Sequence, residues 1–361
     1  MNKTLVTALA FAVSLSAVMA AASRFPSIDP DVRIGTPNDP NFDCNEPDDE
    51  DDAPCAKLFD QQINLLGFAP NASINSATYK DAARFGEGQI SGVSADAAWK
   101  LSIGSSQVAV AILDTGIRWG KNNLRQKIRL NRFELPRPQG ADGATLNESR
   151  DTVFGGYDVN NDGSFNVEDY ANDPRVDKSA GPDGVADLVD AQDLLKTFSD
   201  GTDADANGYI DDIAGWDFFE DDNDPSDTTS YSAADGHGTG RAEDAAVQTN
   251  DGEGDAGVCP RCMVLPLRVW DTFVAPGDTW AAATVYLADL GMQTQEVALG
   301  MLQNTRASKA ANTYAFNKGV ALMQVSSDLN TANHNYPTNY VESVYINGCV
   351  ADVEGGGNEI T

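Results

Sequence analysis

Several residue types are scarce in this sequence, and each scarcity excludes a class of function. The chain of 361 residues has 24 lysines and arginines against 55 aspartates and glutamates, so its formal net charge is −31. Such a charge opposes binding to nucleic acid and to anionic membranes, and we expect neither as a partner. Beyond the first 22 residues no apolar run is long enough to cross a bilayer. With 41% hydrophobic residues, the sequence predicts a globular protein.

The long apolar run at the N-terminus is typical of an export signal. Lys3 precedes the apolar stretch 5–18, and the small residues Ala20 and Ala22 form an A-x-A-like cleavage site. The stretch is too short for a membrane-spanning helix. We therefore expect residues 1–22 to be a signal peptide, and the mature protein to be a monomer secreted to the extracellular space or the periplasm.

Cysteine is also scarce, and its spacing suits an oxidising compartment. Cys44 and Cys55 bracket an acidic loop, and Cys259 and Cys262 form a C-x-x-C motif, so we expect each pair to form a local disulfide. The alternative for Cys259 and Cys262 is half of a zinc site, but no second pair lies at the usual spacing. Cys349 is left over as a free thiol or as the partner of a cysteine in another segment or chain.

Acidic residues are concentrated in one segment. Residues 151–235 hold 23 acidic side chains against three basic ones. Such a block repels itself unless it is disordered or neutralised by cations. Cations are favoured because aspartate and asparagine recur at alternate positions before a glycine, which is the pattern of a Ca²⁺-binding loop. A solvated acidic surface insertion is the alternative.

Two stretches of this insertion carry the calcium pattern. Each has a glycine at position 6 for the sharp turn and an apolar residue soon after it. The expected Ca²⁺ ligands are Asp158, Asn160, Asp162 and Asp169 in "DVNNDGSFNVED", and Asp203, Asp205, Asn207 and Asp211 in "DADANGYIDD".

Outside the insertion, short apolar runs alternate with helical stretches. The runs 107–113, 263–269, 295–300, 319–325 and 343–350 predict buried strands, and the stretches 279–291 and 307–319 predict helices that end at glycine. This order predicts an α/β fold with a parallel sheet covered by helices on both faces. In such sheets, ligands bind at the carboxyl ends of the strands.

An aspartate and a histidine are placed for acid–base chemistry at that edge. Asp114 ends the first predicted strand in "ILDTGI", and His237 lies in the polar loop "DGHGTG" before a helical stretch. A buried aspartate can hold an imidazole in one tautomer, and the order Asp before His occurs in one known serine-hydrolase triad. The only other histidine, His334, lies in a loop and is expected to be solvated or turn-forming.

Together, "VAVAILDTGI" and "DGHGTG" resemble the aspartate and histidine boxes of the subtilisin-like serine peptidases, the subtilases. The resemblance implies that Asp114 orients a general base and that His237 is this base. It also implies that a protein or peptide substrate adds as an extra strand along a groove. The residues that it assigns to this groove are Ala298, Leu299 and Gly300.

The resemblance covers about residues 90–350 and implies a division of the chain. Residues 23–90 would be a loop-rich N-terminal extension. Residues 91–361 would be a partial subtilisin-like peptidase domain, with its C-terminal part missing and with the acidic insertion 151–235 between the two boxes.

The sequence departs from the family pattern in three places. Asp328 takes the position of the asparagine that stabilises the oxyanion, where a charged carboxylate would repel it. Gly240 and Arg241 replace the usual His and Val of the histidine box. Ser343 is the only serine after Asp328, and no Gly-Thr precedes it.

Without a credible nucleophile, two interpretations compete. We expect a fragment of a secreted serine endopeptidase, whose serine lies beyond the chain end and which is inactive alone. The alternative is a catalytically inactive, calcium-binding pseudo-protease or secreted binding scaffold.

Overall fold

The computed structural model describes residues 37, 39, 62–65, 93–99, 101–120, 122–146, 152–178, 186, 188–231, 233–301, 303–326, 335–347, 349–352 and 357–360. The expected signal peptide, the Cys44–Cys55 pair, Asp328 and His334 lie outside these residues. The chain divides into two compact units, one of residues 1–104, 249–258 and 351–359, and a larger one of residues 105–248, 259–350 and 360–361. None of the described helices has the length and apolar character needed to cross a membrane.

A six-stranded parallel sheet organises the larger unit, in the order β2-β3-β1-β4-β5-β6. Its strands are Trp216–Asp217 (β2), Met263–Arg268 (β3), Ala109–Asp114 (β1), Thr294–Val297 (β4), Ala321–Val325 (β5) and Val344–Ile346 (β6). All of β3 is buried, and its sequence is apolar up to Arg268 at its end, as is typical of a strand covered on both faces. The predicted parallel α/β sheet is therefore confirmed.

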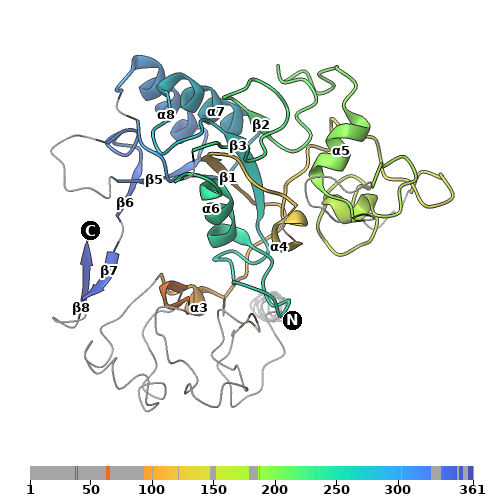
Figure 1. Ribbon diagram of the computed structural model, residues 1–361, viewed down its shortest axis with the longest axis horizontal. Coiled ribbons are helices and arrows are strands. Elements are labelled where there is room, and N and C mark those ends of the chain that lie inside the picture. The colour runs from red at the N-terminus through yellow and green to blue at the C-terminus, as the bar shows by residue number, and fades with distance from the viewer. Residues whose placement is uncertain are drawn as a thin grey trace, which may run out of the picture. The chain divides into compact units, whose positions relative to one another are not determined.

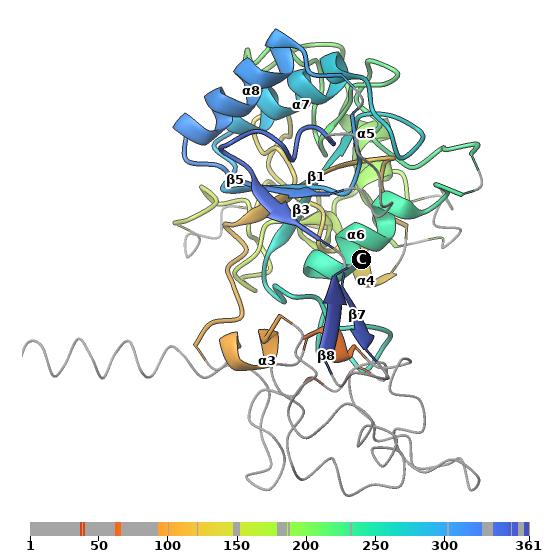
Figure 2. The same ribbon diagram turned by 90° about the vertical axis from the view of Figure 1, so that its left-hand side faces the viewer.

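Helices cover both faces of this sheet (Figures 1 and 2). Helices α7 (Gly277–Asp289) and α8 (Arg306–Asn317) lie on one face, where Trp280 and Leu287 pack in one core with Leu113. Helix α6 (His237–Ala246) lies on the other face, where Ala242 packs in a second core with Ile112. The two helices predicted from periodicity, α7 and α8, are thus present within two residues of their expected bounds.

Shorter elements complete the described structure. In the smaller unit, Leu65, Ala95, Trp99 and Ala256 form a small core of their own. In Figure 1 the acidic segment with α5 lies to the right of the sheet. The remaining helices and strands of the described residues are η1 (Ile63–Leu65), α3 (Ala95–Ala98), α4 (Asn122–Arg125), η4 (Val167–Tyr170), α5 (Ala191–Phe198), β7 (Cys349–Asp352) and β8 (Gly357–Ile360).

The strands differ from the expectation in two ways. The run 343–350 was predicted as one strand, but it contributes β6 to the main sheet and begins β7, which pairs with β8. The turn-forming sequence Asn347-Gly348 separates the two strands. Strand β2 lies inside the acidic insertion and was not predicted, because two residues are too few for a periodic pattern.

Candidate active site

The carboxyl end of β1 brings an aspartate and a histidine into contact. His237 Nδ1 lies 2.8 Å from Asp114 Oδ1, although the two residues are 123 positions apart in the sequence. Asp114 is the last residue of β1, and His237 is the first residue of α6. The structure therefore brings together the two residues of the aspartate and histidine boxes.

A glycine allows α6 to begin this close to the strand. A Cβ atom on Gly238 would lie 2.3 Å from the carbonyl oxygen of Gly116 and 3.0 Å from Asp114 Cβ, so a side chain would force the backbone to move. Gly238 N also donates to Thr115 Oγ1 at 3.2 Å, and Thr115 N donates to Asp114 Oδ1 at 2.7 Å. These contacts hold the carboxylate and the start of α6 in place.

The exposure of each side chain suits its role. An orienting group is held in place by burial, whereas a base must be accessible. The Asp114 side chain is 1% exposed, whereas the His237 side chain is 24% exposed. The ring of Phe273 meets the imidazole edge to face, with 5.0 Å between the ring centroids. Asp114 and Phe273 thus restrict the imidazole while part of it stays accessible to solvent.

This geometry determines which nitrogen of His237 can take up a proton. A carboxylate beside Nδ1 favours the tautomer that carries its proton there, so Nε2 is the acceptor. The buried carboxylate then stabilises the imidazolium that forms. Among the described residues, Asp114 is the only hydrogen-bond partner of the imidazole. The pair can act as a general base and then as a general acid.

The residues expected to edge a substrate groove directly follow β4. Leu299 is buried in the core, and Ala298 is partly buried. Gly300 N donates to the Phe273 carbonyl at 2.9 Å, and the Gly300 carbonyl accepts from Ala275 N at 2.8 Å. Both backbone groups of Gly300 therefore already bond to a neighbouring segment. Substrate binding by these residues stays a prediction.

The hydroxyl of Ser343 is engaged away from His237. Ser343 Oγ donates to Gln324 Oε1 at 2.5 Å and lies 3.2 Å from the Pro337 carbonyl. Gln324 belongs to β5 and is fully buried. This polar network gives Ser343 a structural role beside β5. The oxyanion assignment of Asp328 falls outside the described residues and also stays a prediction.

The two expected calcium loops fold alike. The residues at positions 4 and 6 have positive φ angles in both: 61° and 86° at Asn161 and Gly163, and 59° and 98° at Ala206 and Gly208. In both, the N–H of position 6 donates to the carboxylate of position 1, to Asp158 at 3.0 Å and to Asp203 at 2.8 Å. Positive φ is uncommon outside glycine, so its recurrence at position 4 marks a common loop conformation.

In the first loop, two carboxylates are buried close together. Asp158 is 5% exposed and Asp169 is 3% exposed. Burial raises the pKa of Asp169 to about 7, and the charge of Asp158 adds to this effect, although Asp169 accepts N–H bonds from Val159 and Asn166. A cation between the two carboxylates would favour their charged forms.

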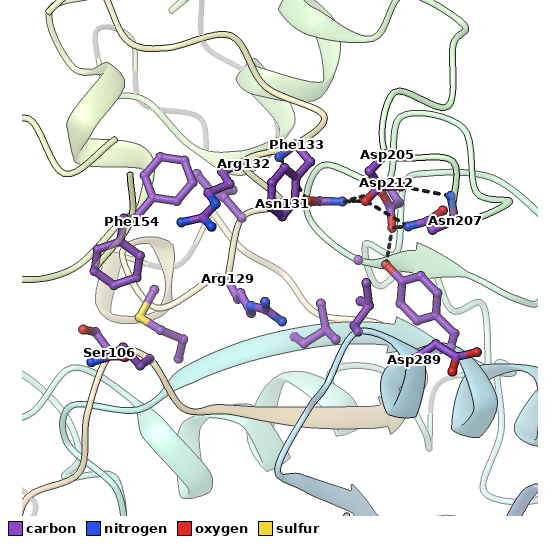
Figure 3. A pocket seen from close by; sticks show the side chains of 18 of the residues that line it. Ser106, Arg129, Asn131, Arg132, Phe133, Phe154, Asp205, Asn207, Asp212 and Asp289 are labelled. Carbon is purple, nitrogen blue, oxygen red and sulfur yellow. Dashed lines mark hydrogen bonds between the residues drawn. The ribbon is translucent and has the colours of Figure 1, made fainter. Parts of the chain in front are cut away.

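Beside the second loop, the structure gathers a set of carboxylates that differs from the expected one, and Figure 3 shows two of its members, Asp205 and Asp212. One oxygen each from Glu134, Asp205 and Asp212 lies within 4.8 Å of the others. Asn131 Nδ2 donates to Asp205 Oδ2 at 3.0 Å and to Asp212 Oδ1 at 2.7 Å. Of the three carboxylates, only Asp205 was expected. The expected ligand Asp211 instead accepts N–H bonds from the preceding turn.

The donor atoms of both loops suit a hard cation. Carboxylate and amide oxygens are the ligands of Ca²⁺, whereas Zn²⁺ prefers sulfur and nitrogen. Burial raises the pKa of Asp212 to about 6, and the charge of Asp205 adds to this effect. Cys259 and Cys262 form the expected disulfide, so they offer no thiolates for zinc. The residues present therefore fit Ca²⁺.

One buried ion pair beside the active-site edge carried no sequence signal. Arg268 ends β3, where it lies in register with Asp114, and it pairs with Asp217 of β2 at 2.7 Å. Both side chains are almost completely buried. Because the two residues lie 51 positions apart, the sequence alone does not indicate this pair, which attaches β2 to the sheet.

Two curated relatives match parts of the chain. The chain is 31% identical to thermitase from Thermoactinomyces vulgaris over 137 residues, which covers 37% of this chain and 46% of thermitase. It is 30% identical to the thermophilic serine proteinase of Bacillus sp. (strain AK1) over 201 residues, which covers 55% of this chain and 45% of that protein. The chain thus spans about half the length of these relatives.

Solved structures with some similarity include fervidolysin from Fervidobacterium pennivorans, a keratinolytic enzyme related to subtilisin. Its identity is 24% and its TM-score 0.34, over 40% of this chain and 22% of fervidolysin. Sphericase matches with 22% identity and a TM-score of 0.34, over 39% of this chain and 46% of sphericase.

The sequence model of the peptidase S8 family, described as the subtilase family, matches residues 105–351. This match covers more than half of the chain and includes both Asp114 and His237. The resemblance found in the two sequence boxes is therefore confirmed, and the chain belongs to the subtilase family.

Proposed function

We propose that this protein is a secreted serine endopeptidase in which Asp114 and His237 supply two members of an Asp–His–Ser triad. The proposal rests on the 2.8 Å contact between these side chains at the carboxyl edge of the parallel sheet. It is supported by the burial of Asp114 and the partial exposure of His237. Membership of the subtilase family agrees with this chemistry.

In this reaction, His237 Nε2 accepts the proton of a serine hydroxyl as the serine oxygen attacks the peptide carbonyl carbon. The imidazolium then gives the proton to the leaving amine, and water hydrolyses the acyl-enzyme. Asp114 keeps the imidazole in its tautomer and stabilises its charged form. Ser343 is the only serine after Asp328 in the sequence, and its hydroxyl bonds to Gln324, so we place the nucleophile on a serine outside these 361 residues.

Calcium has a structural role in this proposal. Asp158, Asp162 and Asp169 would hold an ion in the first loop, and Glu134, Asp205 and Asp212 would hold one at the second. The bound ion would supply positive charge among these acidic groups, of which Asp162 is exposed and the others are buried or partly buried. Stability would then increase with free Ca²⁺ as RT ln(1 + [L]/Kd). The ion takes no part in peptide hydrolysis.

Secretion is part of the same proposal and is tested separately from catalysis. N-terminal sequencing of the protein recovered outside the cytoplasm should begin shortly after Ala22. A chain that stays in the cytoplasm with its first 22 residues intact would contradict secretion.

The proposed activity is tested by cleavage of an unfolded protein substrate by the full-length gene product. The wild type should hydrolyse peptide bonds, and a His237→Ala variant with the same circular dichroism spectrum should not. A folded wild type that binds Ca²⁺ and cleaves nothing would support the calcium-binding pseudo-protease instead.

A further inference from the structure

A glutamate lies beside the Asp114–His237 pair on the neighbouring strand. Glu296 belongs to β4, and the register of the sheet pairs it with Ile112 of β1. Asp114 lies two positions further along β1. Since side chains alternate between the faces of a sheet, Glu296 and Asp114 project from the same face. This is the face on which Ile112 packs with residues of α6.

Each of these two carboxyl groups has an unsatisfied oxygen. Asp114 Oδ1 interacts with Thr115 N and with His237. In contrast, Asp114 Oδ2 and Glu296 Oε2 are both buried and have no hydrogen-bond partner among the described residues. A buried acceptor without a donor is destabilising. A proton on Glu296 would supply a donor for Asp114 Oδ2, directly or through one water molecule.

The charged groups that face Glu296 come from β1 and α6. They are Asp114, Arg241 and Asp244, with His237 bonded to Asp114. Burial raises the pKa of Glu296 to about 8, the charges of Asp114 and Asp244 add to this effect, and Arg241 opposes it. The group is therefore protonated at neutral pH, in agreement with the need for a donor at Asp114 Oδ2.

Arg241 provides a cation on the helix side of Glu296. It lies four positions after His237 in α6, so both side chains share one face of the helix. Arg241 Nη2 pairs with Asp244 Oδ2 at 2.9 Å, whereas Arg241 Nε is buried without a hydrogen-bond partner among the described residues. A free donor in this position can stabilise Glu296 once the glutamate ionises.

We propose that Glu296 is a positioning residue of the Asp114–His237 pair, acting as a neutral carboxylic acid that donates a hydrogen bond toward Asp114 Oδ2. In this form Glu296 steadies Asp114, leaves Oδ1 for His237 and keeps a single negative charge next to the imidazole. When Glu296 ionises, a second negative charge appears beside the pair. The inference rests on the proposed function, in which Asp114 and His237 work together.

A histidine titration followed by NMR tests this coupling. The chain has two histidines, so His334→Gln assigns the Hε1 signals. In the wild type, we expect the His237 signal to report its own titration and a second step near pH 8 from Glu296. Glu296→Gln should remove the second step, because glutamine keeps a hydrogen-bond donor but cannot ionise. The exposed control Glu253→Gln should retain both steps.

Two results would overturn the inference: a wild-type signal without the second step, or a second step that persists in Glu296→Gln. If Glu296→Gln does not fold, the carboxyl ¹³C signal of Glu296 in the wild type provides the test. It must titrate near pH 8, and titration near 4.5 would overturn the inference. None of these measurements needs peptide cleavage. Two-step titration without proteolysis would thus contradict the proposed function and leave the coupling of Glu296 to His237 intact.

Discussion

Asp114 and His237 are joined by a 2.8 Å contact between the last residue of β1 and the first residue of α6. The contact depends on backbone geometry as much as on the two side chains, because α6 starts close to the strand only where Gly238 allows it. The orientation of the imidazole therefore depends on the backbone arrangement of β1 and α6 at this edge of the sheet. Changes to either the carboxylate or this glycine should disturb it.

Replacing Asp114 by asparagine should stop catalysis without unfolding the protein. Asparagine keeps the shape but no longer favours the proton on His237 Nδ1, so Nε2 is not held as an acceptor. We expect kcat of the full-length gene product to fall by about 10⁴-fold. Steady-state kinetics on a peptide substrate measure this loss, with thermal unfolding as the check on folding. A variant with near wild-type kcat would show that Asp114 does not orient the base.

Adding a methyl group to Gly238 should destabilise the protein, whereas the same change two residues later should not. The Cβ of Gly238→Ala would lie 2.3 Å from a backbone oxygen, and we expect a loss of roughly 1–3 kcal/mol. A Cβ on Gly240, in the same helix, meets no atom within 4 Å, so Gly240→Ala should stabilise α6 by up to about 1 kcal/mol. Urea unfolding of both variants measures the difference. Equal stabilities would contradict the close approach of α6 to β1.

Calcium should stabilise the folded chain through the acidic loops. At a free Ca²⁺ concentration of about 100 times Kd, one site adds about 2.7 kcal/mol to the free energy of unfolding. Asp205→Asn should weaken this gain, since it removes one of three clustered carboxylates. The exposed Asp142→Asn, which also removes one negative charge, serves as the control. Calorimetric titration of the chelator-treated protein measures the binding, and equal affinity of the two variants would rule out the cluster as a site.

Without calcium, the free energy of unfolding should fall as the pH rises from about 4 to about 7. Burial raises the pKa of Asp169 from 3.8 to about 7, so in this range the folded chain holds a proton that the unfolded chain has lost. The contribution of Asp169 to stability, which is fully present below pH 4, is therefore lost as the pH rises through about 7. The loss is about 1.4 kcal/mol for each pH unit in which the extra proton is held, before screening by solvent reduces it.

Calcium should flatten this pH dependence, because the ion replaces the proton at Asp169. Asp169→Asn, which cannot ionise, should flatten it in the absence of calcium as well. Urea unfolding at several pH values, with and without chelator, measures both effects. Stability that rises between pH 4 and pH 7 in chelator would show that other groups dominate.

The elements that position the site were largely predictable from sequence. Strands β1 and β3 are apolar apart from the charged residue at the carboxyl end of each, and α7 and α8 have clear helical periodicity followed by glycine. Asp114 and His237 were recognisable because each lies within a short family box next to the right kind of element. In all these cases, the pattern of residues within a short stretch of sequence was sufficient for the prediction.

Other parts of the site depend on contacts that spacing cannot reveal. Glu134 joins Asp205 from a loop 71 positions earlier, and Arg268 meets Asp217 across 51 positions. Glu296 is one of three polar residues in the four-residue strand β4, and only the register of β4 against β1 places it beside Asp114. Such partners are set by the tertiary fold, so the members of the carboxylate cluster beside the second loop could be predicted only in part.

Activation of a serine by Asp114 and His237 is tested most directly by reacting the full-length gene product with a biotinylated fluorophosphonate, which labels activated serines. We predict that the wild type is labelled on one serine outside these 361 residues, and that a folded His237→Ala variant is not labelled. A folded, calcium-loaded wild type that takes up no label, or equal labelling of His237→Ala, would contradict a catalytic role for the pair.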